Sequence, residues 1–248
     1  MAIETLTYEN GVYTGETENG KRHGRGVYKW NDGSSYEGDF VYGQRTGKGV
    51  FCWSDGSSYE GDFVDNQRTG KGIYRWRNGT RYEGDFIDGK KTGSGTLYWA
   101  NGDRYDGAFV DGMRTGLGVF RWANGEVFCG TFSRGVREGL SSFYYKDGSC
   151  FLGTYLHDKR HGPGILTYPD GKSEWQLWEN GELLSSQPIG IAVAESKPEE
   201  KSEAQSPDEK KEDEMLSPAF VPTPEGESGD FSDFRTALNK LTKQFKRK

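Results

Sequence analysis

The hydrophobic and polar positions of this chain recur every 23 residues between Tyr13 and residue 173. Within each unit, two runs alternate between apolar or glycine positions and polar positions, as in Tyr36–Phe40 and Gly49–Trp53. Alternation with a period of two predicts β-strands, here at about positions 1–6 and 14–18 of the unit. A fixed period of this length indicates stacked repeats that share a core. We therefore predict an all-β, elongated array of antiparallel β-hairpins, with seven 23-residue repeats over residues 13–173.

Glycines mark the ends of the predicted strands. Positions 20 and 21 of every unit are Asp-Gly or Asn-Gly, as in Asp55-Gly56, which is a strong signal for a tight turn because glycine accepts positive φ. We place this turn at positions 19–22. The glycine-rich stretch at positions 8–12 predicts the second turn of each unit.

One face of the predicted sheet carries almost only glycine and aromatic residues in the middle repeats. Positions 1, 3 and 5 share this face with positions 14, 16 and 18, and we expect each ring to cover a glycine on a neighbouring strand. A single-layer sheet would leave this face exposed, and large apolar patches usually mark interaction sites. The candidate partner-binding residues are the tryptophans at position 18: Trp30, Trp53, Trp76, Trp99 and Trp122. The opposite face, with acidic positions 2 and 4, is expected to be solvated.

A basic residue occupies position 10 in every repeat. The column consists of Arg22, Arg45, Arg68, Lys91, Arg114, Arg137 and Arg160. One interpretation is structural: charges along a sheet edge protect against strand-to-strand aggregation, or pair with nearby carboxylates. The other is functional: the column binds anionic phospholipid headgroups or an acidic partner. The sequence leaves both open.

The remaining segments flank the array. We expect residues 1–12 to form an N-terminal cap strand and residues 174–185 a closing half-repeat, because terminal repeats are usually atypical. Residues 186–229 are predicted to be a disordered acidic linker, since they contain few apolar residues. Ser206-Pro207, Ser217-Pro218 and Thr223-Pro224 in this linker are either phosphorylation sites or ordinary linker composition.

The C-terminal residues 230–248 have the pattern of a basic amphipathic helix. Five apolar side chains at helical spacing form one stripe, with basic residues around them. Such a helix docks on a partner protein, on an anionic membrane or on its own sheet; alternatively, no stable helix forms. The stripe, a candidate partner surface, is Phe231, Phe234, Leu238, Leu241 and Phe245. The candidate anion-binding side chains beside it are Lys240, Lys243, Lys246, Arg247 and Lys248.

Composition and motifs exclude several function classes. The net charge of −6 argues against nucleic-acid binding, and the three cysteines have no metal-ligand spacing. Residues 43–49 resemble a phosphate-binding loop but have the wrong glycine spacing, and His157 and His161 flank a predicted hairpin loop, where they would not form a zinc pair. We expect no catalytic residue, cofactor or metal site. We also expect no signal peptide, because the first residues lack a basic region and a long apolar run.

The units resemble MORN repeats (membrane occupation and recognition nexus) in their residues. The shared features are Tyr-x-Gly-x-Phe, then Gly-x-x-x-Gly-x-Gly, an aromatic strand and Asp/Asn-Gly, over residues 13–173. The family favours His-Gly at positions 11–12, which only His23-Gly24 and His161-Gly162 retain. The resemblance implies a non-enzymatic platform of the kind found in membrane junctions, axonemal radial spokes and cytoskeletal scaffolds. Family members are associated with protein partners, self-association and anionic phospholipids.

These observations favour a cytoplasmic scaffold that binds a protein partner, in association with the cytoskeleton, a cilium or a membrane junction. The alternative is a peripheral membrane tether that binds anionic phospholipids through position 10 and the C-terminal helix. Self-association is a further expectation from the resemblance. The sequence does not identify the partner.

Overall fold

A computed structural model of the chain describes residues 2–189. These residues form 17 β-strands. The strands are β1 (Ala2–Tyr8), β2 (Gly11–Glu18), β3 (Lys21–Trp30), β4 (Ser35–Val41), β5 (Gln44–Cys52), β6 (Ser58–Val64), β7 (Gln67–Arg75), β8 (Arg81–Ile87), β9 (Lys90–Tyr98), β10 (Arg104–Val110), β11 (Met113–Arg121), β12 (Val127–Ser133), β13 (Val136–Tyr144), β14 (Cys150–Leu156), β15 (Lys159–Thr167), β16 (Ser173–Glu179) and β17 (Glu182–Ile189).

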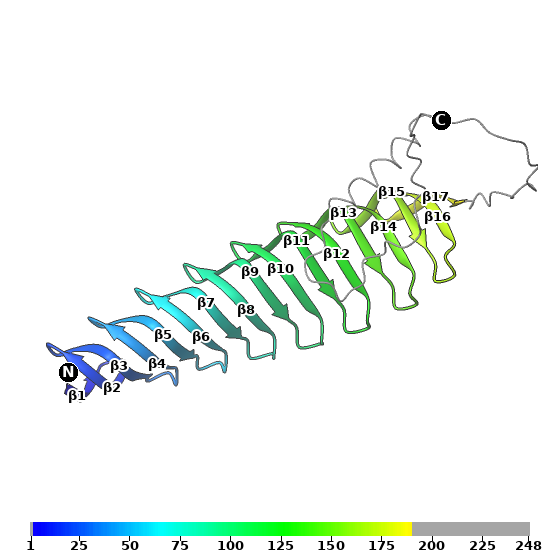
Figure 1. Ribbon diagram of the computed structural model, residues 1–248. Helices are drawn as coiled ribbons and strands as arrows, with labels where there is room; N and C mark the ends of the chain where they lie inside the picture. Colours follow the sequence, from blue (N-terminus) through cyan, green and yellow to red (C-terminus); the bar gives the residue numbers. More distant parts are fainter. Residues whose placement is uncertain (1, 190–248) are drawn as a thin grey trace, which may run out of the picture. The chain divides into compact units, whose positions relative to one another are not determined.

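The strands form one open antiparallel sheet in which sequence neighbours are also spatial neighbours (Figure 1). Every repeat uses the same register; for example, Gly61 of β6 lies opposite Gly72 of β7. The predicted all-β hairpin array is therefore confirmed. The predicted acidic linker and C-terminal helix lie outside the described residues, apart from the first residues of the linker range, which belong to β17. In the described part, no helix is long and apolar enough to cross a membrane.

The second strand of each repeat begins earlier than the sequence analysis predicted. In the second repeat, β5 starts at Gln44, position 9, rather than near position 14. The predicted turn at positions 8–12 is wrong, because only Tyr42 and Gly43 connect the two strands. Both have positive φ, 47° and 88°, as a two-residue hairpin turn of type I′ requires. The strand continues through Gly47, whose φ of 57° marks a bulge rather than a turn.

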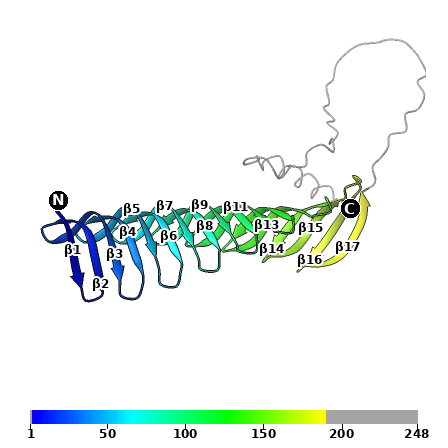
Figure 2. The ribbon, with the colours of Figure 1, turned by 90° about the horizontal axis from the view of Figure 1, so that it is seen from below.

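This bulge bends every hairpin in the array. Gly38 pairs with Gly49, but the next residue, Asp39, pairs with Thr46, so two residues of β5 bulge out. The Asp39 carboxylate accepts a hydrogen bond from the exposed Lys48 amide at 3.1 Å, which satisfies the backbone at the bulge. Bulges increase local twist and bend a strand. Figure 2 accordingly shows strands that curve along their length.

The bend buries the aromatic residues of positions 1 and 5, which a flat single-layer sheet would leave exposed. Tyr36 and Phe40 have exposed fractions of 0% and 1%, and their rings meet edge to face at 5.1 Å. The Phe63 ring of the next repeat makes the same contact with Tyr36, so the rings form a continuous core along the array. Tyr36 also lies directly over Gly49, as predicted: a β-carbon there would be 2.3 Å from its hydroxyl oxygen. The expected exposed apolar patch is thus reduced mainly to the half-buried rings of position 18, since position-16 residues such as Phe51 are largely buried as well.

The opposite face is solvated in the middle repeats. Lys48 pairs with Asp62 at 2.6 Å, and Lys71 pairs in the same way with Asp85, each joining adjacent repeats. These lysines are exposed, so each ion pair contributes at most about 1 kcal/mol. This face is therefore charged and solvated, and the rings lie on the other face, which we call the inner face.

Candidate functional site

The position-18 tryptophans lie in a ladder on the inner face of the array. Trp30, Trp53 and Trp122 each lie against the position-16 ring of their own repeat and that of the next. Trp76 and Trp99 each have one such ring, because position 16 of the fourth repeat is Leu97. Trp53, for example, lies 4.5 Å from Phe51 and 5.3 Å from Tyr74 between ring centroids. Trp30, Trp53, Trp76, Trp99 and Trp122 are all half-buried, so one part of each indole packs on the core and another faces solvent. We call these five residues the tryptophan ladder.

The basic side chains of position 10 turn inward and lie over the aromatic rings. The Arg45 guanidinium carbon lies 5.0 Å from the centroid of Phe51, and three further rings surround it at 5.7–6.0 Å. Arg22, Arg68, Arg114, Arg137 and Arg160 occupy similar cages, and the Lys91 ammonium contacts Trp76, Tyr82 and Phe109. A cation over an aromatic face is attracted by the quadrupole of the ring. We call the seven position-10 residues the cation row.

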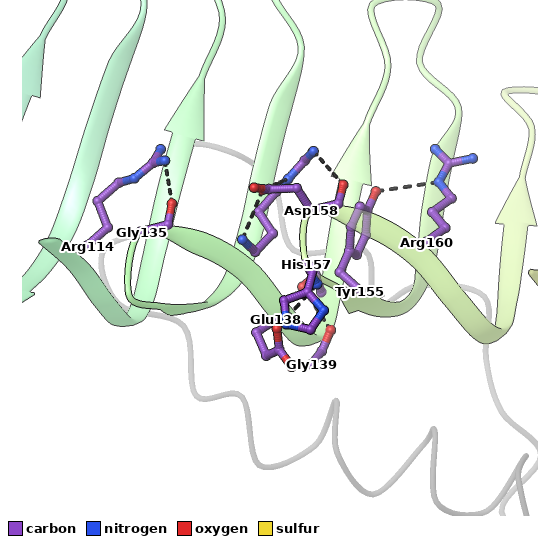
Figure 3. A network of polar contacts seen from close by, with 10 residues as sticks. Arg114, Gly135, Glu138, Gly139, Tyr155, His157, Asp158 and Arg160 are labelled. Carbon is purple, nitrogen blue, oxygen red and sulfur yellow. Dashed lines mark hydrogen bonds and ion pairs between the residues drawn. The ribbon is translucent and has the colours of Figure 1, made fainter. Parts of the chain in front are cut away.

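The cation row also joins each repeat to the next. Arg22 Nη2 donates a hydrogen bond to the Gly43 carbonyl oxygen at 2.7 Å, and Arg68 donates to Gly89 at 3.0 Å. The acceptor is in each case the position-8 carbonyl of the following hairpin turn. Figure 3 shows the same contact between Arg114 and Gly135, at 2.6 Å. These side chains therefore stabilise the stacking of the repeats, a role that the sequence analysis did not predict.

Two members of the row contact a carboxylate or tyrosine hydroxyl groups. Arg137 forms an ion pair with Asp158 at 2.9 Å, and Arg160 donates to the hydroxyl oxygens of Tyr145 and Tyr155, the latter contact being visible in Figure 3. Within residues 2–189, no carboxylate lies at ion-pair distance from Arg22, Arg45, Arg68, Lys91 or Arg114. The N-terminal five positions thus carry positive charge that this part of the chain does not neutralise.

Burial and neighbouring charges shift the ionisation of some members of the row. Desolvation lowers the pKa of Arg45, and the neighbouring charges of Arg22 and Arg68 lower it further. Desolvation likewise lowers the pKa of Lys91, with an added contribution from Arg114. Arg45 and Lys91 are therefore less stable as charges than they would be in water. An anion arriving from outside would relieve this repulsion.

The inner face is hollowed near its N-terminal end. A cavity of about 210 Å³ lies between the guanidinium groups of Arg22 and Arg45, and Tyr28 and Trp30 form part of its wall. It offers hydrogen-bond donors and aromatic surface together. This combination suits a small anionic group attached to an apolar or planar one.

The structure brings two predicted sets of residues together on the inner face but does not test whether either binds a ligand. The tryptophan ladder and the cation row share the inner face, whereas the sequence analysis placed the cations along an edge. The other candidates, Phe231, Phe234, Leu238, Leu241, Phe245, Lys240, Lys243, Lys246, Arg247 and Lys248, lie outside the described residues. In the described part, no cluster of His, Cys, Asp and Glu could hold a metal ion.

A comparison with protein families finds the MORN repeat seven times in this chain. The matched segments are residues 13–35, 36–58, 59–81, 82–104, 105–127, 128–150 and 151–173. They coincide with the units recognised from the sequence. A search of curated proteins found no sequence that matches this chain.

Among solved structures, similar chains include the TCP domain of SAS-4 and the G-box domain of CPAP. The SAS-4 (dCPAP) TCP domain of Drosophila melanogaster, solved in complex with a proline-rich motif of Ana2 (dSTIL), is 16% identical, with 62% of this chain and 84% of that chain covered and a TM-score of 0.41. The G-box domain of the microcephaly protein CPAP is 9% identical, with 77% and 100% covered and a TM-score of 0.49. Because both TM-scores lie below 0.5, we draw no conclusion about function from these similarities.

Proposed function

Since this chain belongs to the MORN-repeat family, and its inner face combines aromatic rings with unneutralised cations, we propose that it is a non-enzymatic scaffold that binds a protein partner along that face. The observation that carries the proposal is the half-buried tryptophan ladder, because tryptophan and arginine are the residues most enriched at the energetic centres of protein interfaces. The location we propose is cytoplasmic, in a cytoskeletal, ciliary or membrane-junction assembly.

The geometry supports an interface that is formed before the partner arrives. The indoles are fixed by their neighbours in the sheet; Trp122 lies 4.5 Å from Phe120 and 5.4 Å from Phe143, and Trp99 lies 5.1 Å from Phe120. Side chains that are already ordered lose little entropy on binding. A repeated array also offers the same contact several times, which suits a long partner segment better than a small molecule.

Replacing Trp99 with Ala is expected to reduce capture of the partner from a cell lysate at least tenfold, because it removes a central ring of the ladder. The matched control is Tyr98→Ala. Tyr98 is the preceding residue and lies on the opposite face, between Arg81 and Arg104 at 4.4 and 5.3 Å. Capture would be measured by pull-down with the full chain and quantitative mass spectrometry, after thermal melts confirm that both variants are folded. Equal capture by the wild type and a folded Trp99→Ala protein would contradict the proposal.

A second candidate function is binding to anionic phospholipids, and the cation row favours it. Six of its members, all except Arg137, lack a carboxylate partner among the described residues, so phosphate groups could neutralise them. We expect the full chain to float with vesicles that contain phosphatidylserine or phosphoinositides at low salt. Raising the salt concentration to about 0.5 M should release it, because screening weakens such contacts. Flotation that persists at high salt, or that occurs equally with neutral vesicles, would contradict this function.

A further inference from the structure

We propose that the inner face receives an extended, proline-containing polypeptide segment that carries a carboxylate at every third residue. Successive carboxylates would meet the cations of successive repeats, from Arg22 to Arg114. This inference rests on the proposed scaffold function and names the chemistry of the partner segment. Three independent features support it: the positive charge of the cation row, the spacing of successive repeats and the position of the tryptophan ladder beside the row.

Charge complementarity selects an acidic segment. Ring contacts and turn carbonyls hold the cations between Arg22 and Arg114 in place. Arg68, for example, donates a hydrogen bond to the Gly89 carbonyl oxygen, and its guanidinium carbon lies 5.2 Å from the centroid of the Tyr74 ring. Arg22, Arg68 and Arg114 each use one nitrogen for that carbonyl, so other N–H groups remain for a carboxylate. Hydrogen bonds between guanidinium and carboxylate groups are about twice as strong as neutral ones. Arg137 already has Asp158, so the proposed footprint ends at Arg114.

The repeat spacing selects an extended segment over a helix. One repeat contains two strands at about 4.8 Å each, which places successive cations about 9.6 Å apart. A polyproline II segment rises about 3.1 Å per residue and has three residues per turn. Every third side chain therefore points in the same direction, about 9.3 Å further along. An α-helix rises about 1.5 Å per residue, so six or seven residues give about 9.0 or 10.5 Å, and the mismatch would accumulate over the five cations.

The tryptophan ladder provides the apolar contact for the residues between the carboxylates. Its indoles run parallel to the cation row, and Arg45 contacts both Trp30 and Phe51, so ladder and row are adjacent. Aromatic surfaces of this kind receive proline rings in other recognition grooves that bind polyproline II segments. The cavity between Arg22 and Arg45 would receive the first carboxylate of the segment.

The first test compares two fluorescent peptides of identical composition. One contains five copies of Glu-Pro-Pro, which gives a constant spacing of three. In the other the same residues are rearranged so that the spacing alternates between two and four. We expect the full chain to bind the regular peptide at least tenfold more tightly at physiological ionic strength, as measured by fluorescence anisotropy. Equal affinities would show general charge attraction and would overturn the inference.

A pair of variants tests whether the cation row provides the contact. Lys91→Gln removes a cation of the row without removing a bond to a turn, since Lys91 contacts only rings. Lys90→Gln is the control: it changes the net charge equally, one residue away, at a side chain paired with Asp111 at 3.2 Å. We expect about a fivefold loss of affinity for the regular peptide from Lys91→Gln and less than twofold from Lys90→Gln. Equal losses in the two folded variants would overturn the inference.

The outcomes also separate this inference from the proposed scaffold function. If Trp99→Ala abolishes partner capture but neither peptide binds, the scaffold function holds and the acidic period-three segment is wrong. If neither peptide binds and Lys91→Gln instead reduces flotation with anionic vesicles, the row binds lipid and the inference is again wrong. Selective binding of the regular peptide that depends on Lys91 supports it.

Discussion

Replacing Gly72 with Ala is expected to destabilise the array by about 3 kcal/mol or more, although the change adds only one methyl group. A β-carbon at this position would lie 2.4 Å from the Tyr59 hydroxyl oxygen and 2.5 Å from its ring. Tyr59 has an exposed fraction of 0% and packs edge to face against Phe63 and Phe86, so it has no room to move. Urea unfolding followed by circular dichroism would measure the loss.

The sixth repeat supplies a natural control for this prediction. There the position equivalent to Gly72 is Ser141, with an exposed fraction of only 1%, and the ring facing it is Phe128, which has no hydroxyl. Tyr59→Phe should therefore recover part of the loss caused by Gly72→Ala. We expect a coupling of about 1 kcal/mol or more in the double-mutant cycle. A cost below about 1 kcal/mol for Gly72→Ala, or additive effects, would show that ring and glycine do not share this space.

Raising the pH from 9 to 12 is expected to unfold the array. Desolvation by burial raises the pKa of Tyr36, Tyr59 and Tyr105 to about 12 in the folded chain, against an ordinary value near 10. Between these values the unfolded chain loses protons that the folded chain keeps, so folded stability falls as the pH rises. A shift of two pKa units corresponds to roughly 3 kcal/mol for each tyrosine once the pH exceeds both values, so the three together approach the whole stability of a typical domain.

The buried cations act in the opposite sense, since burial lowers their pKa, but among them only Arg160 is shifted far, to about 10.

Thermal melts at increasing pH, together with tyrosinate absorbance, would follow the transition. The control is the triple variant Tyr36→Phe, Tyr59→Phe and Tyr105→Phe, which keeps the rings, as the sixth and seventh repeats do with Phe128 and Phe151. It should lose about 1 kcal/mol per hydrogen bond at neutral pH but unfold at a higher pH than the wild type. A wild-type chain that remains folded while its tyrosines ionise near pH 10 would contradict the prediction.

The sequence predicted the repeat, the hairpins and the covering of glycines by rings because these depend on local alternation and on turn chemistry. Both signals recur seven times, so each repeat supports the assignment of the others. The bend was not predicted, because it depends on Gly47 adopting positive φ inside a strand instead of in a turn. Without the bend, the aromatic face was expected to be open.

The position of the cation row was missed for the same reason. With the strand continued back to position 9, Arg45 lies opposite Phe40 and therefore on the same face as the rings. Positions 10, 14, 16 and 18 are all even-numbered, so the alternation of a continuous strand indicates one shared face. The turn predicted at positions 8–12 broke this strand and separated position 10 from the other three. The exchange of hydrogen bonds between one repeat and the next could not be read from a single unit.

The contact between each position-10 side chain and the following turn makes length an adjustable property of this fold. A repeat contacts its neighbour through a strand pairing, one turn carbonyl oxygen and a few rings, and these contacts recur along the array. Inserting or deleting one 23-residue unit would change the reach of the array by about 10 Å while leaving the other junctions intact. Duplication of a single unit in the gene would therefore lengthen the array by a fixed step of one repeat.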